Sequence, residues 1–396
     1  MGQIQSVNRV RRYVPCLEGI RGYGFLLVFC GHYFMPAQLA HPGTIRIKLL
    51  TSLSSLGLFA VPAFFVLSGY LIGGILYDTR DREGFFRVFY SRRIMRVFPV
   101  FYLTLLAIAC FYATRGVVPN HVFWMHFLYI QNLLPSYSEW NSAPVAMIHF
   151  WSLAVEEQFY LLWPLVVWLF PDRRKLIGIA SALIAFSFGL RLLAPLVSIT
   201  PRQILYITPT RVDAILLGVV LALIRPNAVL ERIQPFAKWF VLSAGATLML
   251  LANWKGAAWL RTYQGVEVLI PLVNFTAVAI IIAVMEEKSL LNRACSQRWI
   301  CWLGSLSYSL YVFHLTFYHF FMGSLITQLC MFMRYQFAVL TSGVLAFALT
   351  LMLSILSYRF IEGPIMNLKR HTNYGPAKPH SVARVVGERV LVSAGD

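Results

Sequence analysis

Two ionisable residues stand out in the apolar stretch 17–33, because both would lie inside a membrane helix. Arg21 and His32 are eleven positions apart, which on an α-helix puts them within roughly 20° of one face and about 16 Å apart along the axis. A charge inside a bilayer is costly and usually has a function. One stripe of this helix therefore carries a fixed cation and a titratable imidazole. The alternative is an anchoring helix whose arginine reaches the headgroups and whose histidine only hydrogen-bonds.

A second group of polar residues enters the apolar run that starts near residue 148. It comprises His149, Trp151, Ser152, Glu156 and Glu157. His149 and Glu156 share a helix face, whereas Glu157 is turned about 100° away. Two adjacent carboxylates inside a membrane indicate a functional site, although one of them could instead pair with an arginine of another span, Arg191 or Arg211.

Two later apolar runs also carry polar side chains. Arg211 and Asp213 lie two positions apart and could form an internal ion pair or contact a substrate. Ser307, Tyr311 and His314 fall at i, i+4 and i+7, so they form one polar stripe. Such a stripe belongs in a bundle interior or a wet cavity, and hydrogen bonding between helices is its alternative role.

Three arginines precede the third apolar run, in the stretch YSRRIMRVFPVFY. Arg93 and Arg96 are one helical turn apart, so that together with the adjacent Arg92 they could bind a multiply charged phosphate group. The alternative is the ordinary enrichment of basic residues on the cytoplasmic side of a membrane.

The composition indicates a polytopic membrane protein. Of the 396 residues, 58% are hydrophobic and 13% charged, whereas soluble domains have about 25% charged residues. The net charge of +18 does not indicate nucleic-acid binding, since the basic residues sit between apolar runs. The six cysteines are neither paired closely nor placed beside histidines, so no disulfide framework or metal site is predicted.

The apolar runs predict an all-α bundle of about ten transmembrane helices. With about 20 residues per span, the spans fall near 15–35, 50–77, 98–114, 148–170, 176–197, 208–224, 238–253, 264–285, 300–323 and 336–357. Residues 121–134 are too short to cross, so an interfacial or re-entrant segment is predicted, with Trp124 and Tyr129 at headgroup level.

The basic residues predict the orientation. Clusters at 9–12, 80–96 and 173–175 and in the tail alternate with loops that carry few basic residues, so both termini should be cytoplasmic. The predicted organisation is a cytoplasmic segment 1–14, a membrane domain 15–366 and a polar cytoplasmic tail 367–396.

Seven motifs, in order between residues 17 and 364, resemble membrane acyltransferase family 3. This family includes O-acetyltransferases of O-antigen, exopolysaccharide and nodulation factors and acyltransferases of macrolides. The motifs are LEGIRGYGFLLVFCGHYF, FFVLSGYLI, RRIMRVFP, HFWSLAVEEQFYLLWP, TRVDAILLG, LGSLSYSLYVFH and YRFIEGP. Some members carry an additional SGNH domain. None follows the last motif here, so the acyl group is expected to reach its acceptor without one.

The resemblance implies roles for particular residues. His32 matches the proposed catalytic histidine, Arg21 its partner on the same helix, and Glu156 a recurrent acid. Arg93 and Arg96, with Arg92, match arginines implicated in handling acyl-CoA. The residues expected around the substrate are His149, Trp151, Ser152, Arg211, Asp213, Ser307, Tyr311 and His314.

The expected function is therefore transfer of an acyl group, with acetyl-CoA as donor, to a hydroxyl of a cell-surface glycan or lipid-linked glycan such as lipopolysaccharide. The expected location is the bacterial inner membrane, without a permanently bound cofactor. His32 would act as a general base or become acylated itself, and Glu156 would orient it. The alternative is a multi-pass exporter of a small metabolite, although no internal repeat is visible.

Overall fold

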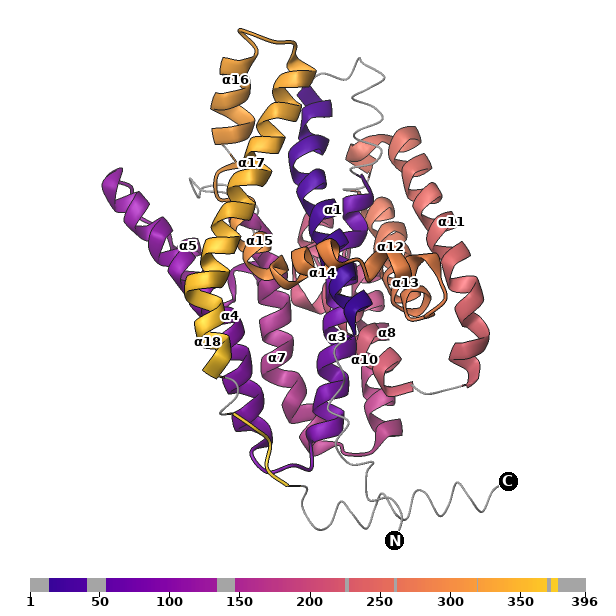
Figure 1. Cartoon of the computed structure of the whole chain (residues 1–396). Helices are drawn as coiled ribbons and strands as arrows, with labels where there is room; N and C mark the ends of the chain where they lie inside the picture. Colours follow the sequence, from indigo (N-terminus) through magenta and orange to yellow (C-terminus); the bar gives the residue numbers. More distant parts are fainter. Residues whose placement is uncertain are drawn as a thin grey trace, which may run out of the picture.

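The computed structural model describes residues 14–40, 55–133, 147–224, 228–259, 262–318, 320–368 and 372–376. Within these ranges the chain forms helices joined by loops, with no β-strand, as Figure 1 shows. The longer helices are α1 (Pro15–Ala40), α3 (Ala60–Thr79), α4 (Phe85–Thr114), α7 (Trp151–Leu169), α8 (Arg173–Leu193), α10 (Thr208–Ile224), α11 (Ala228–Trp259), α12 (Tyr263–Val284) and α17 (Tyr335–Ser357). The predicted all-α class is confirmed.

Six stretches of the described chain are long and apolar enough to cross a membrane. They are Leu56–Thr79, Phe85–Thr114, Arg173–Leu193, Pro201–Ile224, Tyr263–Val284 and Tyr335–Asn367. The protein is therefore a polytopic membrane protein, and the total of about ten spans stays a prediction. The ends of the predicted domain organisation, 1–13 and 377–396, lie outside the described residues.

Helix α4 begins earlier than the sequence suggested. It starts after Gly84, whose φ of 74° lies in the left-handed region that glycine adopts readily. The arginine cluster was expected in a loop before a span near residue 98. The structure instead places Arg92, Arg93 and Arg96 on α4 itself, so their side chains have defined directions.

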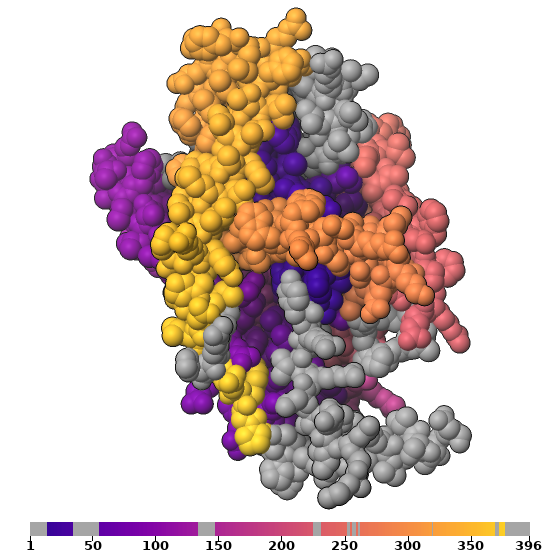
Figure 2. All heavy atoms as spheres, viewed as in Figure 1, coloured from indigo at the N-terminus to yellow at the C-terminus, as the bar shows by residue number. Residues whose placement is uncertain are grey.

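The predicted continuous span 300–323 is wrong. The chain there forms α14 (Arg298–Ser305) and α15 (Ser307–Phe313), followed by a π-helix, η5 (Phe320–Leu325), and α16 (Ile326–Leu329). At the break, the hydroxyls of Ser305 and Ser309 donate to backbone carbonyls three residues earlier, at 2.6 and 3.1 Å, and so compete with regular helical bonding. Figures 1 and 2 show α14, together with α13 (Leu290–Cys295), crossing in front of α1.

The predicted interfacial segment forms short turns: α5 (His121–Met125), η2 (His126–Leu128) and η3 (Gln131–Leu133). Trp124 is 56% exposed, as expected for a residue at headgroup level. Tyr129, by contrast, is only 6% exposed and stacks on Phe101 with ring centroids 4.5 Å apart, so its side chain packs inside the protein. Its carbonyl accepts a hydrogen bond of 2.7 Å from the Gln158 amide, which fixes the turn against α7. Residues 134–146 lie outside the described part.

Helices α3 and α10 pack with their backbones in contact. A Cβ atom on Gly69 would lie 1.8 Å from the carbonyl oxygen of Ile215, and one on Gly218 would lie 2.0 Å from that of Val66. Neither distance can accommodate a carbon atom, so only glycine fits at these two positions. These two glycines therefore allow the close packing of α3 against α10.

Candidate active site

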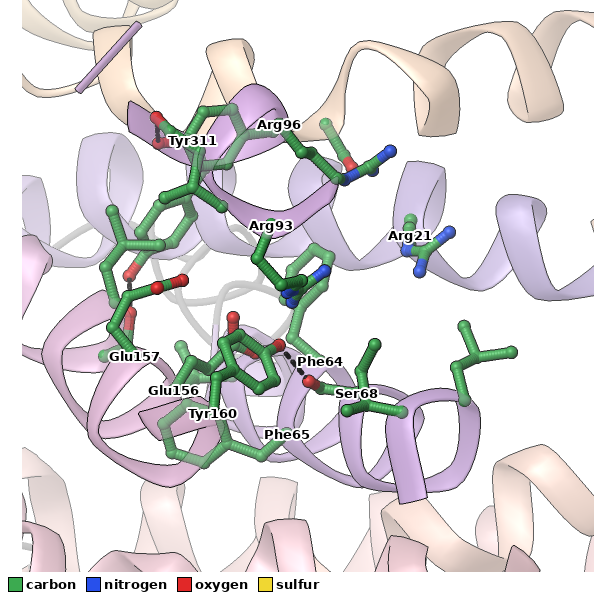
Figure 3. A pocket seen from close by; sticks show the side chains of 18 of the residues that line it. Arg21, Phe64, Phe65, Ser68, Arg93, Arg96, Glu156, Glu157, Tyr160 and Tyr311 are labelled. Atoms are coloured by element: carbon green, nitrogen blue, oxygen red, sulfur yellow. Dashed lines mark hydrogen bonds between the residues drawn. The ribbon is translucent and has the colours of Figure 1, made fainter. Parts of the chain in front are cut away.

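A cavity of about 280 Å³ lies between α1, α3, α4, α7 and α15. Five arginine and glutamate side chains line it: Arg21 from α1, Arg93 and Arg96 from α4, and Glu156 and Glu157 from α7. Figure 3 shows the two carboxylates on one side of the cavity and Arg21 at the opposite end. The remaining lining is largely apolar and aromatic, which makes the cavity suitable for a ligand with an anionic part and an apolar part.

Arg93 lies over the ring of Tyr160, with 3.9 Å from the guanidinium carbon to the ring centroid. The Tyr160 hydroxyl is in turn hydrogen-bonded to the Ser68 hydroxyl, so α3, α4 and α7 meet at this point (Figure 3). The buried Nε of Arg93 has no hydrogen-bond partner. The stacking therefore orients the guanidinium while leaving donors for a ligand.

The other cavity arginines differ in their partners. Arg21 donates to Glu18 over 2.5 Å, one helical turn earlier on α1. Within the described part of the chain, no ion pair joins Arg93 or Arg96 to Glu156 or Glu157. The cavity thus holds guanidinium groups that the facing carboxylates do not neutralise by direct contact.

Arg92 lies apart from this group. Its guanidinium donates to the carbonyl of Thr372 at 2.6 Å and to the side chain of Asn373 at 3.2 Å, and it faces the Tyr374 ring at 5.4 Å. The sequence placed it with Arg93 and Arg96, but on a helix the adjacent position points about 100° away. Arg92 therefore contacts the segment 372–376 and does not line the cavity.

Three histidines from distant parts of the chain come together beyond the cavity. His32 of α1 has its Nδ1 3.2 Å from Nε2 of His314, which follows α15. His149, in the turn η4 (Ile148–Phe150) before α7, has its ring centroid 4.9 Å from that of His314. His149 and His314 are each 1% exposed. The structure thus assembles the three histidines that the sequence singled out separately.

Tyr311 connects the cavity with the histidines. It lines the cavity, and its hydroxyl lies 2.7 Å from that of Ser152 and donates to the carbonyl of His149 at 2.9 Å. The Tyr311 ring centroid is 5.3 Å from that of His314 and 5.5 Å from that of His149. One aromatic side chain therefore separates the arginine-lined cavity from the histidine cluster. Ser307, one helical turn earlier on α15, also lines the cavity.

Glu156 does not contact His32, although the sequence assigned it the role of orienting this residue. It lines the cavity with Arg93 and Arg96, and none of the hydrogen bonds among described residues joins it to His32. The side chain that meets His32 is His314. The expected catalytic pairing is therefore corrected: Glu156 faces the arginines, and an imidazole is the neighbour of His32.

Arg211 and Asp213 do not pair with each other. Asp213 accepts from Arg191 at 2.8 Å and from the Asn274 amide at 3.0 Å, which joins α8, α10 and α12. Arg211 is buried and lies over the Trp151 ring, 5.7 Å from its centroid. Arg191 and Asp213 thus form a buried structural ion pair, and neither Arg211 nor Trp151 lines the cavity.

Comparison with known proteins assigns the chain to a family. The model of acyltransferase family 3, an acyltransferase domain, matches residues 14–359. The chain belongs to acyltransferase family 3. Both the cavity and the histidine cluster lie within the matched residues.

Curated bacterial proteins resemble the chain along most of its length. The peptidoglycan O-acetyltransferase OatA of Listeria monocytogenes is 26% identical over 375 residues, which cover 90% of this chain and 56% of that protein. The O-acetyltransferase OatA of Staphylococcus aureus is 27% identical over a match that covers 89% of this chain and 57% of that protein. YrhL of Bacillus subtilis is 29% identical over a match that covers 89% of this chain and 55% of that protein. Peptidoglycan O-acetylation is a provisional assignment for YrhL. The chain thus spans little more than half the length of these relatives, and no solved structure matches it.

The cavity also contains polar residues that sequence analysis did not select. They are Ser68, Tyr160 and Tyr308. Tyr160 follows Glu156 by four positions and so shares its helix face, a spacing that could have identified it. Ser68 lies in the motif FFVLSGYLI, but a single serine in an apolar run does not by itself indicate a site.

Proposed function

We propose that the protein is an integral membrane O-acetyltransferase that moves an acetyl group from acetyl-CoA to a hydroxyl group of a cell-surface or exported glycan. The observation that carries the proposal is the arginine-lined cavity that ends at Tyr311, with the His32–His314 pair on the other side of that ring. Family membership supports acyl transfer, and the names of the curated relatives support acetyl as the group transferred.

The donor is proposed to bind through its phosphates. Coenzyme A carries several negative charges, and planar guanidinium groups bind phosphate oxygens with two parallel hydrogen bonds. Arg93 and Arg96 lie one helical turn apart on α4, and Arg21 faces the same cavity. The apolar remainder of the lining suits the pantetheine arm, which would direct the thioester towards Tyr311.

The proposed reaction is proton removal followed by attack on the thioester. His32 takes the proton of the acceptor hydroxyl, and the hydroxyl oxygen forms a bond to the carbonyl carbon of acetyl-CoA. The carbon–sulfur bond breaks, and the departing thiolate receives the proton from the imidazolium. The products are an O-acetyl ester and free CoA. Transient acetylation of His32, followed by attack of the same hydroxyl, gives the same products.

The acceptor is proposed to be a glycan hydroxyl at the outer face. The Listeria monocytogenes relative carries peptidoglycan in its name, so bacterial cell-wall glycan is the first acceptor to examine. The short helical turns at 121–133, which carry the exposed Trp124, lie against α4 and α7 and offer aromatic surface for sugar rings.

Mass spectrometry of surface glycans tests this proposal. Cells that produce the protein should contain glycan fragments with an additional acetyl ester, and cells without it, or with the His32→Gln variant at equal membrane level, should not. Release of the ester by mild alkali identifies O-acetylation. Transport of a small metabolite without any change in glycan mass would instead favour the exporter and contradict the proposal.

A further inference from the structure

His32 and His314 are held together by two contacts between α1 and the end of α15. Beside the contact between the rings, the hydroxyl of Tyr33 donates to the backbone carbonyl of His314 over 2.8 Å. Phe25, two turns earlier on α1, meets the His314 ring edge-on, with 6.1 Å between centroids. Tyr33 therefore fixes the backbone of His314, and Phe25 packs against its ring.

The carbonyl groups around the pair determine which nitrogens carry protons. Nδ1 of His314 lies 2.7 Å from the carbonyl oxygen of Tyr311, so this nitrogen must be the donor, and in the neutral ring Nε2 is then an acceptor. Nδ1 of His32 lies 3.2 Å from this Nε2 and 3.0 Å from the carbonyl oxygen of Val28. Both of its neighbours are acceptors, so Nδ1 of His32 carries the proton.

We infer that His314 is a positioning residue that holds His32 with its Nε2 unprotonated and available as the reactive nitrogen. This inference rests on the proposed function for its catalytic meaning, but the proton arrangement itself follows from the geometry. It also explains how His32 works without a carboxylate among its described hydrogen-bond partners. The role that a carboxylate has in a Ser-His-Asp triad is taken here by a second imidazole.

The pair also accommodates the charge that forms during transfer. When Nε2 of His32 takes the proton of the acceptor hydroxyl, the ring becomes an imidazolium with protons on both nitrogens. Its Nδ1 proton then lies in a hydrogen bond to Nε2 of His314, which can accept it, while the Nδ1 proton of His314 stays on that nitrogen, in its hydrogen bond to the Tyr311 carbonyl. After the Nε2 proton passes to the thiolate of CoA, the Nδ1 proton returns and both rings are neutral.

Substitutions at His314 test the role through activity. In His314→Ala we expect glycan acetylation, normalised to membrane protein level, to fall on the order of 10²-fold, because the imidazole loses its orientation. His314→Gln should retain distinctly more activity, since its amide can accept from His32 and donate to Tyr311. Thr350→Val is the control: Thr350 is also buried and its hydroxyl donates to a backbone carbonyl, that of Ala346, over 2.8 Å, but it lies on α17 and does not line the cavity. Normal acetylation by both His314 variants would overturn the inference.

Nitrogen-15 NMR of the histidine rings tests the proton arrangement without any substrate. In the full-length protein labelled with [15N]histidine, His32 and His314 should each show a protonated Nδ1. His149 should show a protonated Nε2, because that atom faces the carbonyl of Val312 at 3.3 Å. A His32 ring protonated at Nε2 in the wild type would refute the inference whatever the activity. If the arrangement is observed but no glycan is acetylated, the proposed function fails and the geometry stands.

Discussion

His32 is connected to the cavity through His314 and Tyr311, and its neighbours leave one ring nitrogen free. A histidine with a structural role only should tolerate glutamine, which also donates and accepts hydrogen bonds. A base or an acyl carrier cannot be replaced by an amide, because an amide has no useful basicity near neutral pH.

We therefore expect His32→Gln to reach the membrane normally and to lose acetylation by about 10²- to 10⁴-fold, the usual contribution of a general base. The measurement is the acetyl content of surface glycan per amount of membrane protein, with Thr350→Val as the control. Near-normal acetylation would exclude the first helix from the chemistry and shift attention to His149.

The arginines of α4 give a second prediction about individual residues. Arg93→Ala combined with Arg96→Ala should abolish acetylation while the protein remains in the membrane, because the donor loses its phosphate ligands. Lysine at both positions should restore only part of the acetylation, since lysine keeps the positive charge but lacks the planar guanidinium group that binds two phosphate oxygens at once. Arg87→Ala, an exposed arginine on the same helix, is the control.

Binding of acetyl-CoA to purified protein decides between the two roles of these arginines. Unchanged affinity in the double alanine variant would mean that Arg93 and Arg96 only set the membrane orientation. A loss of affinity in Arg87→Ala of the same size would mean that any basic residue on α4 contributes through its charge alone.

Several parts of the site could be predicted from residue types alone. His32, His149 and His314 were identified because an imidazole in an apolar helix needs an explanation. Their mutual contacts were not predictable, because they depend on how α1, η4 and α15 pack. The same limit explains the wrong partners given to Glu156 and Asp213: the sequence shows that a buried charge needs a counter-charge, but only packing decides which one it meets.

At the scale of helices, the contact of α3 with α10 gives a stability prediction. Gly69→Ala should lower the melting temperature in detergent or prevent accumulation, because its Cβ would overlap the carbonyl of Ile215 at 1.8 Å. Gly178→Ala in α8 is the matched control, since nothing lies within 4 Å of its Cβ position. That change should leave stability equal or raise it by about 0.5–1 kcal/mol. Equal melting temperatures for both variants would contradict the packing.

The helices themselves were largely predictable, because a run of about 20 apolar residues has few alternatives to spanning a membrane. Two features were not. The early start of α4 was not predicted, because the charged residues of its first turns are typical of a loop between spans. The break between α14 and α15 depends on serine hydroxyls bonding to the backbone, and serines occur in unbroken membrane helices as well.

For the molecule as a whole, the distribution of basic residues predicts the membrane orientation. Reporter fusions after Lys175 and Lys288 should report the cytoplasm, and a fusion after Lys255 should report the outside. Alkaline phosphatase and green fluorescent protein give opposite signals at each site and so control for expression. A fusion at Lys175 that reads outside would mean that residues 121–134 cross the membrane, and it would reverse the orientation predicted for α7.

The glycine contacts also limit how the molecule can deform. Helices whose backbones touch cannot slide or rotate without overlap, and this applies to α3 with α10 and also to α1 with α14, where a Cβ on Gly304 would lie 2.0 Å from the Glu18 carbonyl. Helices α4 and α7 contain no glycine, so they meet their neighbours through side chains that can change rotamer. Of the helices that line the cavity, α1 and α3 are therefore held by backbone contacts, whereas α4 and α7 can yield. We expect any swelling that admits a ligand to occur on the side that carries Arg93, Arg96, Glu156 and Glu157.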